Sequence, residues 1–325
     1  MNELYPLKFT PIFKDKVWGG RKIHDLLGLD FTPLPNCGEA WVLSGVPGSQ
    51  TLVSNGFLKG NELNELVEVY MDDLVGERAL ERFPEQFPIL VKFIDSNDWL
   101  SIQVHPDDAL AAKRKIGNGK TEMWYIVEAD KGAELISGFS QQVNQKVYLD
   151  YLHQKRLKEL LNTEPVSGGD VFFMPAGRVH ALGPGILLAE IQQTSDTTYR
   201  IYDWDRVDHE GKARELHTDE ALEAIDFTTE NSYRTPYSRI LNHPVNLVDC
   251  QAFTTNLQEF DRGIEKDLSH IDSFIIYLCT EGACTIQYLR GMEQMKKGEL
   301  VLIPASMEHL FLVPQSSAKV LEIHL

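Results

Sequence analysis

The chain has 325 residues, of which 43% are hydrophobic and 24% are charged, the composition of a folded globular protein rather than a disordered one. At roughly 150 residues per domain, this length predicts about two domains. The chain carries 31 Lys and Arg residues against 48 Asp and Glu residues, which gives a net charge of −17. This balance argues against a nucleic-acid partner or a membrane surface, because both need a positively charged face.

The start of the chain, MNELYPLKFTPIF, has no basic residues followed by a long apolar run, so we expect no secretory signal. No stretch approaches 18 consecutive apolar residues, which excludes a membrane-spanning helix. The four cysteines contain no C-x-x-C pair and are too sparse for a disulfide scaffold. We therefore predict reduced thiols and a cytoplasmic location.

Helical spacing of apolar residues predicts three helices: Asn61–Val75, Tyr148–Leu161, and one that runs from an N-cap at Thr218 to Ile225. The polar stretch Thr228–Asn242 is expected to be a linker. Most of the remainder is typical of short strands separated by Gly and Pro. The predicted strands are Ile89–Ile94, Leu100–Val104, Met123–Val127, Val171–Met174, Ile186–Ile191, Phe274–Leu278, Leu300–Ile303 and Val320–Ile323.

An internal repeat indicates how the chain is organised. Residues 169–180 and 298–309 both follow the gap-free pattern G-[D/E]-x4-P-x4-H. In each copy, four apolar residues after the acidic residue predict a buried strand, and the proline predicts a turn. The pattern resembles the second conserved motif of the cupin superfamily, and its duplication implies a bicupin, a mainly β protein with two cupin-type barrels and a few accessory helices. We place the N-terminal catalytic domain at residues 1–235 and the C-terminal domain at residues 236–325.

The segment from Ser101 to His105 places polar side chains on one face of a strand, because alternate residues point the same way. Ser101, Gln103 and His105 therefore point into the first barrel, and the two apolar residues between them pack outward. Glu122 begins the next strand and His180 ends the first copy of the repeat. A lone histidine is usually structural, but His105, Glu122 and His180 lie where cupins hold a metal. With Gln103 they form a set suited to Zn²⁺, with Mn²⁺, Fe²⁺ or Co²⁺ possible, although Gln103 could instead hydrogen-bond to a ligand.

Three cationic residues are expected near this set: Lys92, Lys120 and Arg200. Each lysine could simply be a solvated surface charge. Arg200 could form a salt bridge with one of the acidic residues near it in the sequence, namely Asp196, Asp203 or Asp205.

Longer motifs then become recognisable. LSIQVHPDD, GKTEMWY, PAGxxHA and the spacing E…SD…R over residues 190–200 resemble type I mannose-6-phosphate isomerases, as do PIFK…WGG and GEAW near the start of the chain. The resemblance covers roughly residues 5–325 and matches the shorter bacterial form of the family. The chain departs from the longer members around Arg200, where TTYRIY stands in place of their turn, although the arginine keeps its register.

The resemblance implies that one Zn²⁺ per chain is bound by Gln103, His105, Glu122 and His180. It also implies that Arg200 is the active-site arginine, and that Lys92, Ser101, Lys120, Glu190 and Asp196 lie around a sugar-phosphate pocket. The implied activity is the interconversion of mannose 6-phosphate and fructose 6-phosphate through an enediol or enediolate, by a monomer or homodimer whose partner is the small sugar phosphate. In such a reaction, Arg200 can stabilise developing negative charge but cannot serve as a base.

Glu190 and Lys120 are the candidates for the base, and Ser101 and Lys92 are candidate phosphate contacts. Two other kinds of function stay open: an Fe²⁺-dependent oxygenase using the same three metal ligands, and a non-catalytic sugar-phosphate-binding bicupin. An oxygenase needs no cationic cluster, and a binding protein needs no base, so the isomerase is the favoured hypothesis.

The second copy of the repeat is expected to bind no metal. Aligning Gly282 with Gly132 places Asp272 opposite the Glu122 position, and His309 matches His180. Residues 254–256 supply no counterpart of Gln103 and His105. His270 could add a third ligand, but we expect the second barrel to be structural or to form an interface.

Overall fold

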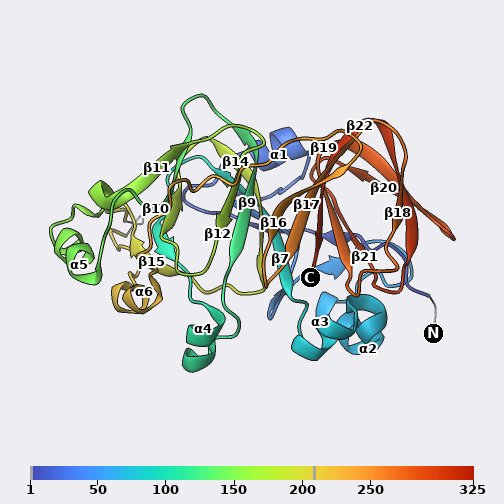
Figure 1. The fold of residues 1–325 in the computed structure, drawn as a ribbon, viewed down its shortest axis with the longest axis horizontal. Coiled ribbons are helices and arrows are strands. Elements are labelled where there is room, and N and C mark those ends of the chain that lie inside the picture. Colours follow the sequence, from blue (N-terminus) through green and yellow to red (C-terminus); the bar gives the residue numbers. More distant parts are fainter. Residues whose placement is uncertain (1–2, 208–209) are drawn as a thin grey trace.

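The computed structural model describes residues 3–207 and 210–325. Residues 1–2, at the start of the segment tested for a secretory signal, and residues 208–209, within the predicted first domain, lie outside the described residues. Two β-rich halves lie side by side in Figure 1, with short helices around their edges. The mainly β prediction is therefore confirmed.

The first half contains two antiparallel sheets. One has the order β12 (Val171–Met174), β9 (Glu122–Ala129), β14 (Ile186–Gln193), β7 (Ile89–Ser96), β3 (Glu39–Leu43) and β2 (Ile12–Lys14). The other has the order β11 (Leu161–Pro165), β10 (Glu134–Phe139), β13 (His180–Leu182), β8 (Ile102–Val104) and β15 (Tyr199–Tyr202). Two short pairs, β1 (Phe9–Thr10) with β6 (Leu52–Val53) and β4 (Gly45–Val46) with β5 (Ser49–Gln50), complete this half.

The second half is built on one antiparallel sheet of seven strands. Its main order is β16 (Pro244–Asp249), β17 (Thr254–Phe260), β22 (His309–His324), β19 (Ile275–Tyr288) and β20 (Gly291–Lys296). Two further strands join it: β18 (Ile264–Asp267) pairs with β22, and β21 (Leu300–Ile303) pairs with β19. The expected linker between the halves contains no helix or strand, only an isolated bridge between Phe172 and Arg234.

Six α-helices occur in the described residues: α1 (Lys22–Leu27), α2 (Leu63–Val75), α3 (Glu77–Arg82), α4 (Asp108–Arg114), α5 (Gln145–His153) and α6 (Thr218–Ala224). The helix predicted over Asn61–Val75 is α2, which begins with a capping box between Glu62 and Glu65.

Two helix predictions need correction. The predicted helix Tyr148–Leu161 is divided into α5 and a short 3₁₀ turn, Leu157–Leu160, because Lys155 adopts the left-handed conformation with φ of +57°. Thr218 is the first residue of α6 rather than its cap; the N-cap is His217, whose side chain does not cap the helix.

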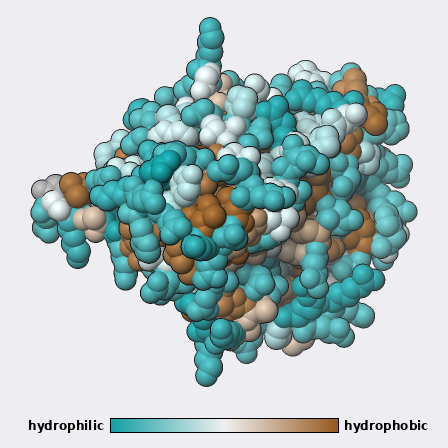
Figure 2. All heavy atoms as spheres, turned by 60° about the vertical axis from the view of Figure 1, so that its left-hand side comes forward, coloured by the Kyte–Doolittle hydropathy of each residue, from teal (hydrophilic) through white to brown (hydrophobic). Residues whose placement is uncertain are grey.

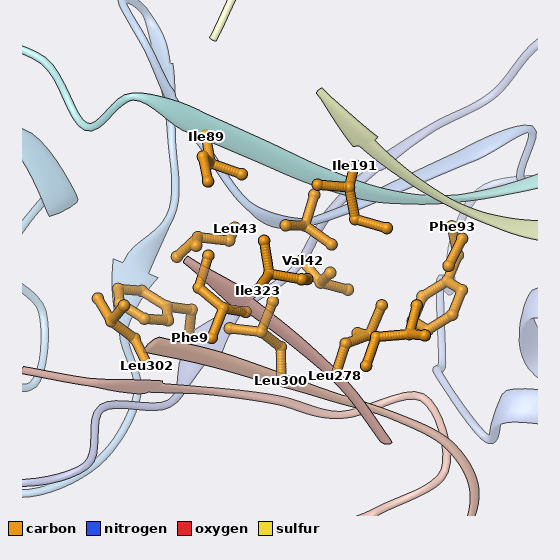
Figure 3. Packing of buried hydrophobic residues seen from close by; sticks show 14 of the residues in the cluster. Phe9, Val42, Leu43, Ile89, Phe93, Ile191, Leu278, Leu300, Leu302 and Ile323 are labelled. Carbon is orange, nitrogen blue, oxygen red and sulfur yellow. The ribbon is translucent and has the colours of Figure 1, made fainter. Parts of the chain in front are cut away.

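A continuous apolar core joins the two halves. Figure 3 shows Phe93 and Ile191 from the first half facing Leu278, Leu300 and Ile323 from the second half. Because side chains alternate along a strand, the neighbours of Phe93 on β7, Lys92 and Ile94, point to the opposite face of the same sheet. One face of β7 and β14 is therefore buried in the core between the halves, and the side chains on the opposite face are free to line a cavity.

Segments of the N-terminal chain also pack on the second half. The Leu7 and Leu302 backbones exchange hydrogen bonds, and the carbonyl of Leu74 in α2 accepts one from Ala305. Figure 1 shows α2 and α3 beneath the sheet of the second half. Asp272 holds α3 there by accepting hydrogen bonds from the backbone of Glu77 and Arg78.

The surface turned forward in Figure 2 is mainly hydrophilic, with hydrophobic side chains gathered near its middle. In the described ranges, 3–207 and 210–325, no helix combines the length and apolar character needed to cross a membrane.

Candidate active site

A buried ion pair forms the wall of a cavity on the free face of β7 and β14. Glu190 lies directly opposite Lys92 on one side and Trp124 on the other. Lys92 Nζ is 3.0 Å from Glu190 Oε1, and Trp124 Nε1 donates a hydrogen bond of 2.9 Å to Glu190 Oε2. Each oxygen of Glu190 therefore has one partner, and the carboxylate is held in a fixed orientation.

Burial and the nearby Glu122 carboxylate raise the pKa of Glu190 above its usual range. Burial alone would lower the pKa of Lys92, but the carboxylates of Glu190 and Glu39 outweigh it and raise that pKa. A buried glutamate with a raised pKa can exchange a proton near neutral pH more readily than an ordinary surface carboxylate.

The short strand β8 presents its residues as the alternation predicts. Ile102 and Val104 pack in a cluster with Tyr148 and Ala221, outside the sheet. Gln103 points to the other face, where its Nε2 lies 3.2 Å from His180 Nε2. His180 lies directly opposite Gln103 in the ladder, so the sheet itself brings these two side chains together.

His105, Glu122 and His180 form a buried cluster in which one potential ligand atom from each lies within 4.8 Å of the others, and His180 also lines the cavity. His105 Nε2 is 3.3 Å from Glu122 Oε1, and His180 Nε2 is 3.7 Å from Glu122 Oε2. Lys120 Nζ contacts the same group, at 2.8 Å from Glu122 Oε1 and 3.2 Å from His105 Nε2. Three predicted ligands are thus in one cluster, and the fourth, Gln103, borders it.

The remaining ring nitrogens of both histidines are held by the backbone. His105 Nδ1 donates to the carbonyl of Thr197 at 3.0 Å, and His180 Nδ1 donates to the carbonyl of Arg178 at 2.8 Å. With the proton on Nδ1, each Nε2 presents its lone pair to the cluster.

The protonation states in the cluster are those that a metal requires. Burial and Lys120 lower the pKa of His105 to about 3, and burial also lowers the pKa of His180, so both rings are neutral at pH 7. Burial would raise the pKa of Glu122, but Lys120 and His105 lower it well below its usual range. Neutral imidazoles and an ionised carboxylate bind a cation without first losing a proton.

The residues present therefore fit a divalent metal. Glu122 is fully buried, and the Lys120 ammonium compensates only its Oε1, at 2.8 Å. Its Oε2 has no hydrogen-bond partner among the described residues and only the His180 ring nearby, at 3.7 Å, which leaves a buried carboxylate oxygen for a cation. Two nitrogens, a carboxylate and an adjacent amide form a mixed N/O donor set. The amide of Gln103 can present its oxygen to the same point by rotating about its terminal bond.

The cavity above the cluster has a volume of about 250 Å³. Five cationic and three anionic side chains line it, an excess of positive charge on a chain whose net charge is −17. Such an excess favours an anionic ligand. All of the predicted substrate-pocket and catalytic residues are among its lining: Lys92, Ser101, Lys120, Glu190, Asp196 and Arg200.

Arg200 forms none of the salt bridges considered from the sequence. Its Nη1 donates to the backbone carbonyl of Glu215 at 2.7 Å, and its Nε has no hydrogen-bond partner among the described residues. The nearby acid Asp203 is instead occupied by Arg206 and Arg214. Arg200 thus has donors available to a ligand in the cavity.

Several lining residues were not singled out from the sequence: Lys16, Trp18, Glu39, Thr198 and Arg214. Glu39 pairs with Lys16 at 3.1 Å and accepts a hydrogen bond from Trp41 at 2.7 Å. Burial opposes ionisation of Glu39, but Lys92 and Lys16 lower its pKa to about 2. The GEAW motif carried the signal, since Glu39 and Trp41 lie on the strand beside β7.

The strand pairing in the two halves shows which residues of the two copies correspond. It corrects the prediction, based on aligning Gly282 with Gly132, that Asp272 occupies the Glu122 position. Met174 lies opposite Glu122, whereas Ile303, its counterpart in the repeat, lies opposite Ile275. Ile275, and not Asp272, therefore occupies the Glu122 position. His309 lies opposite Asp267, and 62% of the His309 side chain is exposed. The only His/Cys/Asp/Glu cluster with metal-binding geometry in residues 3–207 and 210–325 is the one in the first half.

Comparison with known proteins gives a consistent result. Residues 6–153 match the family model "Phosphomannose isomerase type I, catalytic domain". The chain is 35% identical to the mannose-6-phosphate isomerase ManA of Bacillus subtilis over 303 residues, which cover 92% of this chain and 93% of that protein. It is 32% identical over 302 residues to the mannose-6-phosphate isomerase of Streptococcus mutans, with 92% of each chain covered.

Solved structures show the same relationship. The crystal structure of mannose 6-phosphate isomerase from Bacillus subtilis matches with a TM-score of 0.87 at 31% identity, over 98% of this chain and 99% of that one. Mutant structures of phosphomannose isomerase from Salmonella typhimurium, at 16% identity and a TM-score of 0.78, cover 98% of this chain and 99% of theirs, and show a shared fold.

Proposed function

Since the chain belongs to the type I phosphomannose isomerase family, we propose that its first cavity interconverts mannose 6-phosphate and fructose 6-phosphate. The observation that carries this proposal is the buried His105–Glu122–His180 cluster, which borders a cavity with excess positive charge through His180. This combination suits an aldose–ketose isomerase, which must hold an anionic sugar and stabilise negative charge on oxygen.

The proposed cofactor is one Zn²⁺ per chain, held by His105, Glu122 and His180 with Gln103 completing the set. Two histidines and one carboxylate with a further oxygen are a frequent environment for catalytic zinc. The metal would supply a Lewis acid beside the sugar carbonyl. Lys120, whose Nζ is 2.8 Å from Glu122, would lie beside the sugar oxygens nearest this set.

Two buried groups divide the proton transfers in this proposal. Glu190 removes the proton from C2 of the aldose and returns it to C1, and Lys120 passes the hydroxyl proton from O2 to O1. C2 and O2 each lose one proton, and C1 and O1 each gain one, so the aldose becomes the ketose through the enediol without any other reactant. The raised pKa of Glu190 and its fixed orientation between Lys92 and Trp124 support its role.

The remaining lining residues bind and orient the substrate. Arg200 stabilises the negative charge that develops on oxygen, because its guanidinium stays charged and has free donors. Ser101 and Lys92 are proposed to contact the phosphate, and Asp196 to accept hydrogen bonds from sugar hydroxyls. Lys92 is held in place for this by Glu190.

Two further proposals concern the whole chain. We place catalysis within residues 1–235 and none in residues 236–325, since the second half has an isoleucine at the Glu122 position. We also place the protein in the cytoplasm. All four cysteines are free thiols in the structure, and three of them, Cys37, Cys279 and Cys284, are buried, which suits a reducing compartment.

The direct test of the function is an assay of the purified chain on mannose 6-phosphate, with fructose 6-phosphate detected by a coupled enzyme. Turnover that stops with a chelator and returns with Zn²⁺ supports the reaction and the metal together. A folded, Zn²⁺-loaded chain without turnover on either sugar phosphate would contradict the proposal.

Replacing Glu190 by glutamine is expected to lower kcat by about 10²–10⁴-fold, the usual contribution of a general base, while metal content stays at one ion per chain. Glu39→Gln is the matched comparison, because Glu39 lines the same cavity but has a pKa of about 2 and is a poor base. Its loss in kcat should stay below about tenfold. Both variants would be compared by steady-state kinetics and metal analysis. A Glu190→Gln protein whose kcat stayed within tenfold of the native value would exclude Glu190 as the base.

A further inference from the structure

The second half contains a cavity of its own, of about 850 Å³, between β16, β17, β18 and β22. A row of polar side chains crosses four strands at its base. Asn246 lies opposite Asn256, Asn256 lies opposite Glu322, and Glu322 lies opposite Tyr277. Directly opposite residues in an antiparallel sheet share a face, so these four side chains form one continuous polar strip.

This strip is the counterpart of the polar wall in the first half. There, Glu190 lies opposite Trp124 and Lys92. Because Ile275 occupies the Glu122 position, Tyr277 occupies the Trp124 position, and the residue opposite it, Glu322, occupies the Glu190 position.

Glu322 also makes the same kinds of contact in the second half as Glu190 makes in the first. Glu190 accepts a hydrogen bond from Trp124 and pairs with Lys92 at 3.0 Å. Glu322 accepts one of 2.8 Å from the Tyr277 hydroxyl and pairs with Lys266 at 2.5 Å. Both glutamates are 4% exposed. The second half has thus kept the form of the substrate wall, although its lysine comes from β18 instead of the strand opposite the glutamate.

Gln258 provides the independent sign of a ligand. It is 1% exposed and lines the cavity, yet neither its Oε1 nor its Nε2 has a hydrogen-bond partner among the described residues. Gln258 occupies the position that Ile94 has in the first half. Glu322 matches Glu190, so Val320 matches Leu188, and these two residues lie opposite Gln258 and Ile94 respectively. A buried amide without partners costs free energy that a hydroxylated ligand would offset by donating and accepting hydrogen bonds.

The charges indicate what the ligand is. The lysine and the arginine that line the cavity each have an acidic neighbour: Lys266 contacts Glu322, and Arg78 lies 3.6 Å from Asp272. No lining lysine or arginine is therefore left for a phosphate. The buried amide without partners is that of Gln258, and a hydroxyl group, which both donates and accepts, is its natural complement.

We propose that this second cavity binds a neutral, unphosphorylated sugar of one or two hexose units and performs no chemistry on it. Pro244, Ile264 and Leu268 offer apolar surface to the C–H face of such a ring. The site is non-catalytic because the metal ligand Glu122 is replaced by Ile275. It stands apart from the isomerase proposal, because no residue of the first cavity takes part.

Equilibrium dialysis with radiolabelled D-mannose and mannobiose tests this on the Zn²⁺-loaded full chain, with mannose 6-phosphate and its product held at saturating concentration so that the first cavity is filled. We expect one equivalent of neutral sugar to bind under these conditions. Gln258→Leu should weaken that binding at least tenfold while kcat stays within twofold of the native value, which also shows that the variant is folded.

The matched control is Thr255→Val. Thr255 is also fully buried with an unpartnered hydroxyl, but it lies beside Leu257 on the opposite face of β17, which packs into the core shared by the halves. Sugar binding by this variant should be unchanged. The proposal is overturned if the native chain binds neither sugar at about 100 mM, because even a site with a Kd of about 10 mM would then be about 90% occupied. It is also overturned if the sugar phosphate displaces all bound sugar, or if Gln258→Leu binds as the native chain does.

Discussion

Replacing His180 by alanine is expected to remove bound metal and turnover together. The ring supplies one of the three donors that lie within 4.8 Å of one another, and its loss leaves a histidine and a carboxylate, which hold a divalent ion poorly. Even the loss of a residue that only supports a ligand typically costs 10–100-fold in metal affinity, so the loss of a ligand should exceed about 100-fold. Metal content by mass spectrometry and kcat on mannose 6-phosphate would be measured on the same preparation.

The duplicated motif supplies a matched control for this variant. His309 occupies the equivalent position in the second copy, but its side chain is 62% exposed and lies 3.9 Å from Asp267. His309→Ala should therefore retain one metal ion per chain and native turnover. A His180→Ala protein that kept a full equivalent of metal would disprove the ligand assignment, and metal loss in His309→Ala would show that the second half binds metal.

Arg200→Ala is the second variant with a large expected effect. The guanidinium lines the cavity, and its Nε has no partner in residues 3–207 and 210–325, so in the reaction its positive charge is available to oxygen atoms of the substrate. Removing one such preorganised donor usually lowers kcat by about 10²–10³-fold, or about 3–4 kcal/mol in transition-state stabilisation. In the described residues the Arg200 side chain hydrogen-bonds to the Glu215 backbone and has no ion pair with His105, Glu122 or His180, so metal content should be unchanged.

Arg114→Ala provides the control for a lost arginine next to this segment. Arg114 stacks over the ring of Tyr199 and pairs with Glu223 at 3.1 Å, outside the cavity. Its replacement should leave kcat within about twofold, since surface ion pairs contribute about 0–1 kcal/mol. If both variants had the same kcat as the native chain, Arg200 would have no role in the reaction beyond packing against Glu215.

The meeting of His105, Glu122 and His180 could be predicted from the sequence because its geometry follows from local rules. Strand alternation places Gln103 and His105 on one face, and the repeat places His180 at the start of the strand paired with β8. Glu122 lies on β9 in the other sheet of the first half. It meets the two histidines if the two sheets face one another. Each step depends on a pattern of a few residues, and each pattern is present in the sequence.

The rest of the cavity depends on contacts that leave weaker local signals. Glu39 reaches the site because β3 pairs with β7, and Arg214 because it is held by Asp203 across a turn. The GEAW motif marks Glu39, but no short sequence pattern shows that its strand pairs with β7 or that Arg214 pairs with Asp203. The same limit explains the error at Gly282, which lies at a bulge inside the 14-residue strand β19, whereas Gly132 follows the end of β9. Counting back from these two glycines therefore misses the true register by three residues.

The helix errors have a similar origin. Apolar spacing over Tyr148–Leu161 suits one helix, but the left-handed backbone at Lys155 ends it and redirects the chain into β11. A lysine has no special preference for that conformation, so the break comes from tertiary packing rather than from local propensity.

One metal ion in the first half is proposed to support isomerisation. This is tested by titrating the metal-free chain with Zn²⁺ while the turnover of mannose 6-phosphate is followed. We predict that kcat rises linearly and stops rising at one equivalent per chain, because one described cluster has metal-binding geometry. Full turnover of the metal-free chain, or activity that continues to rise to two equivalents, would contradict this account.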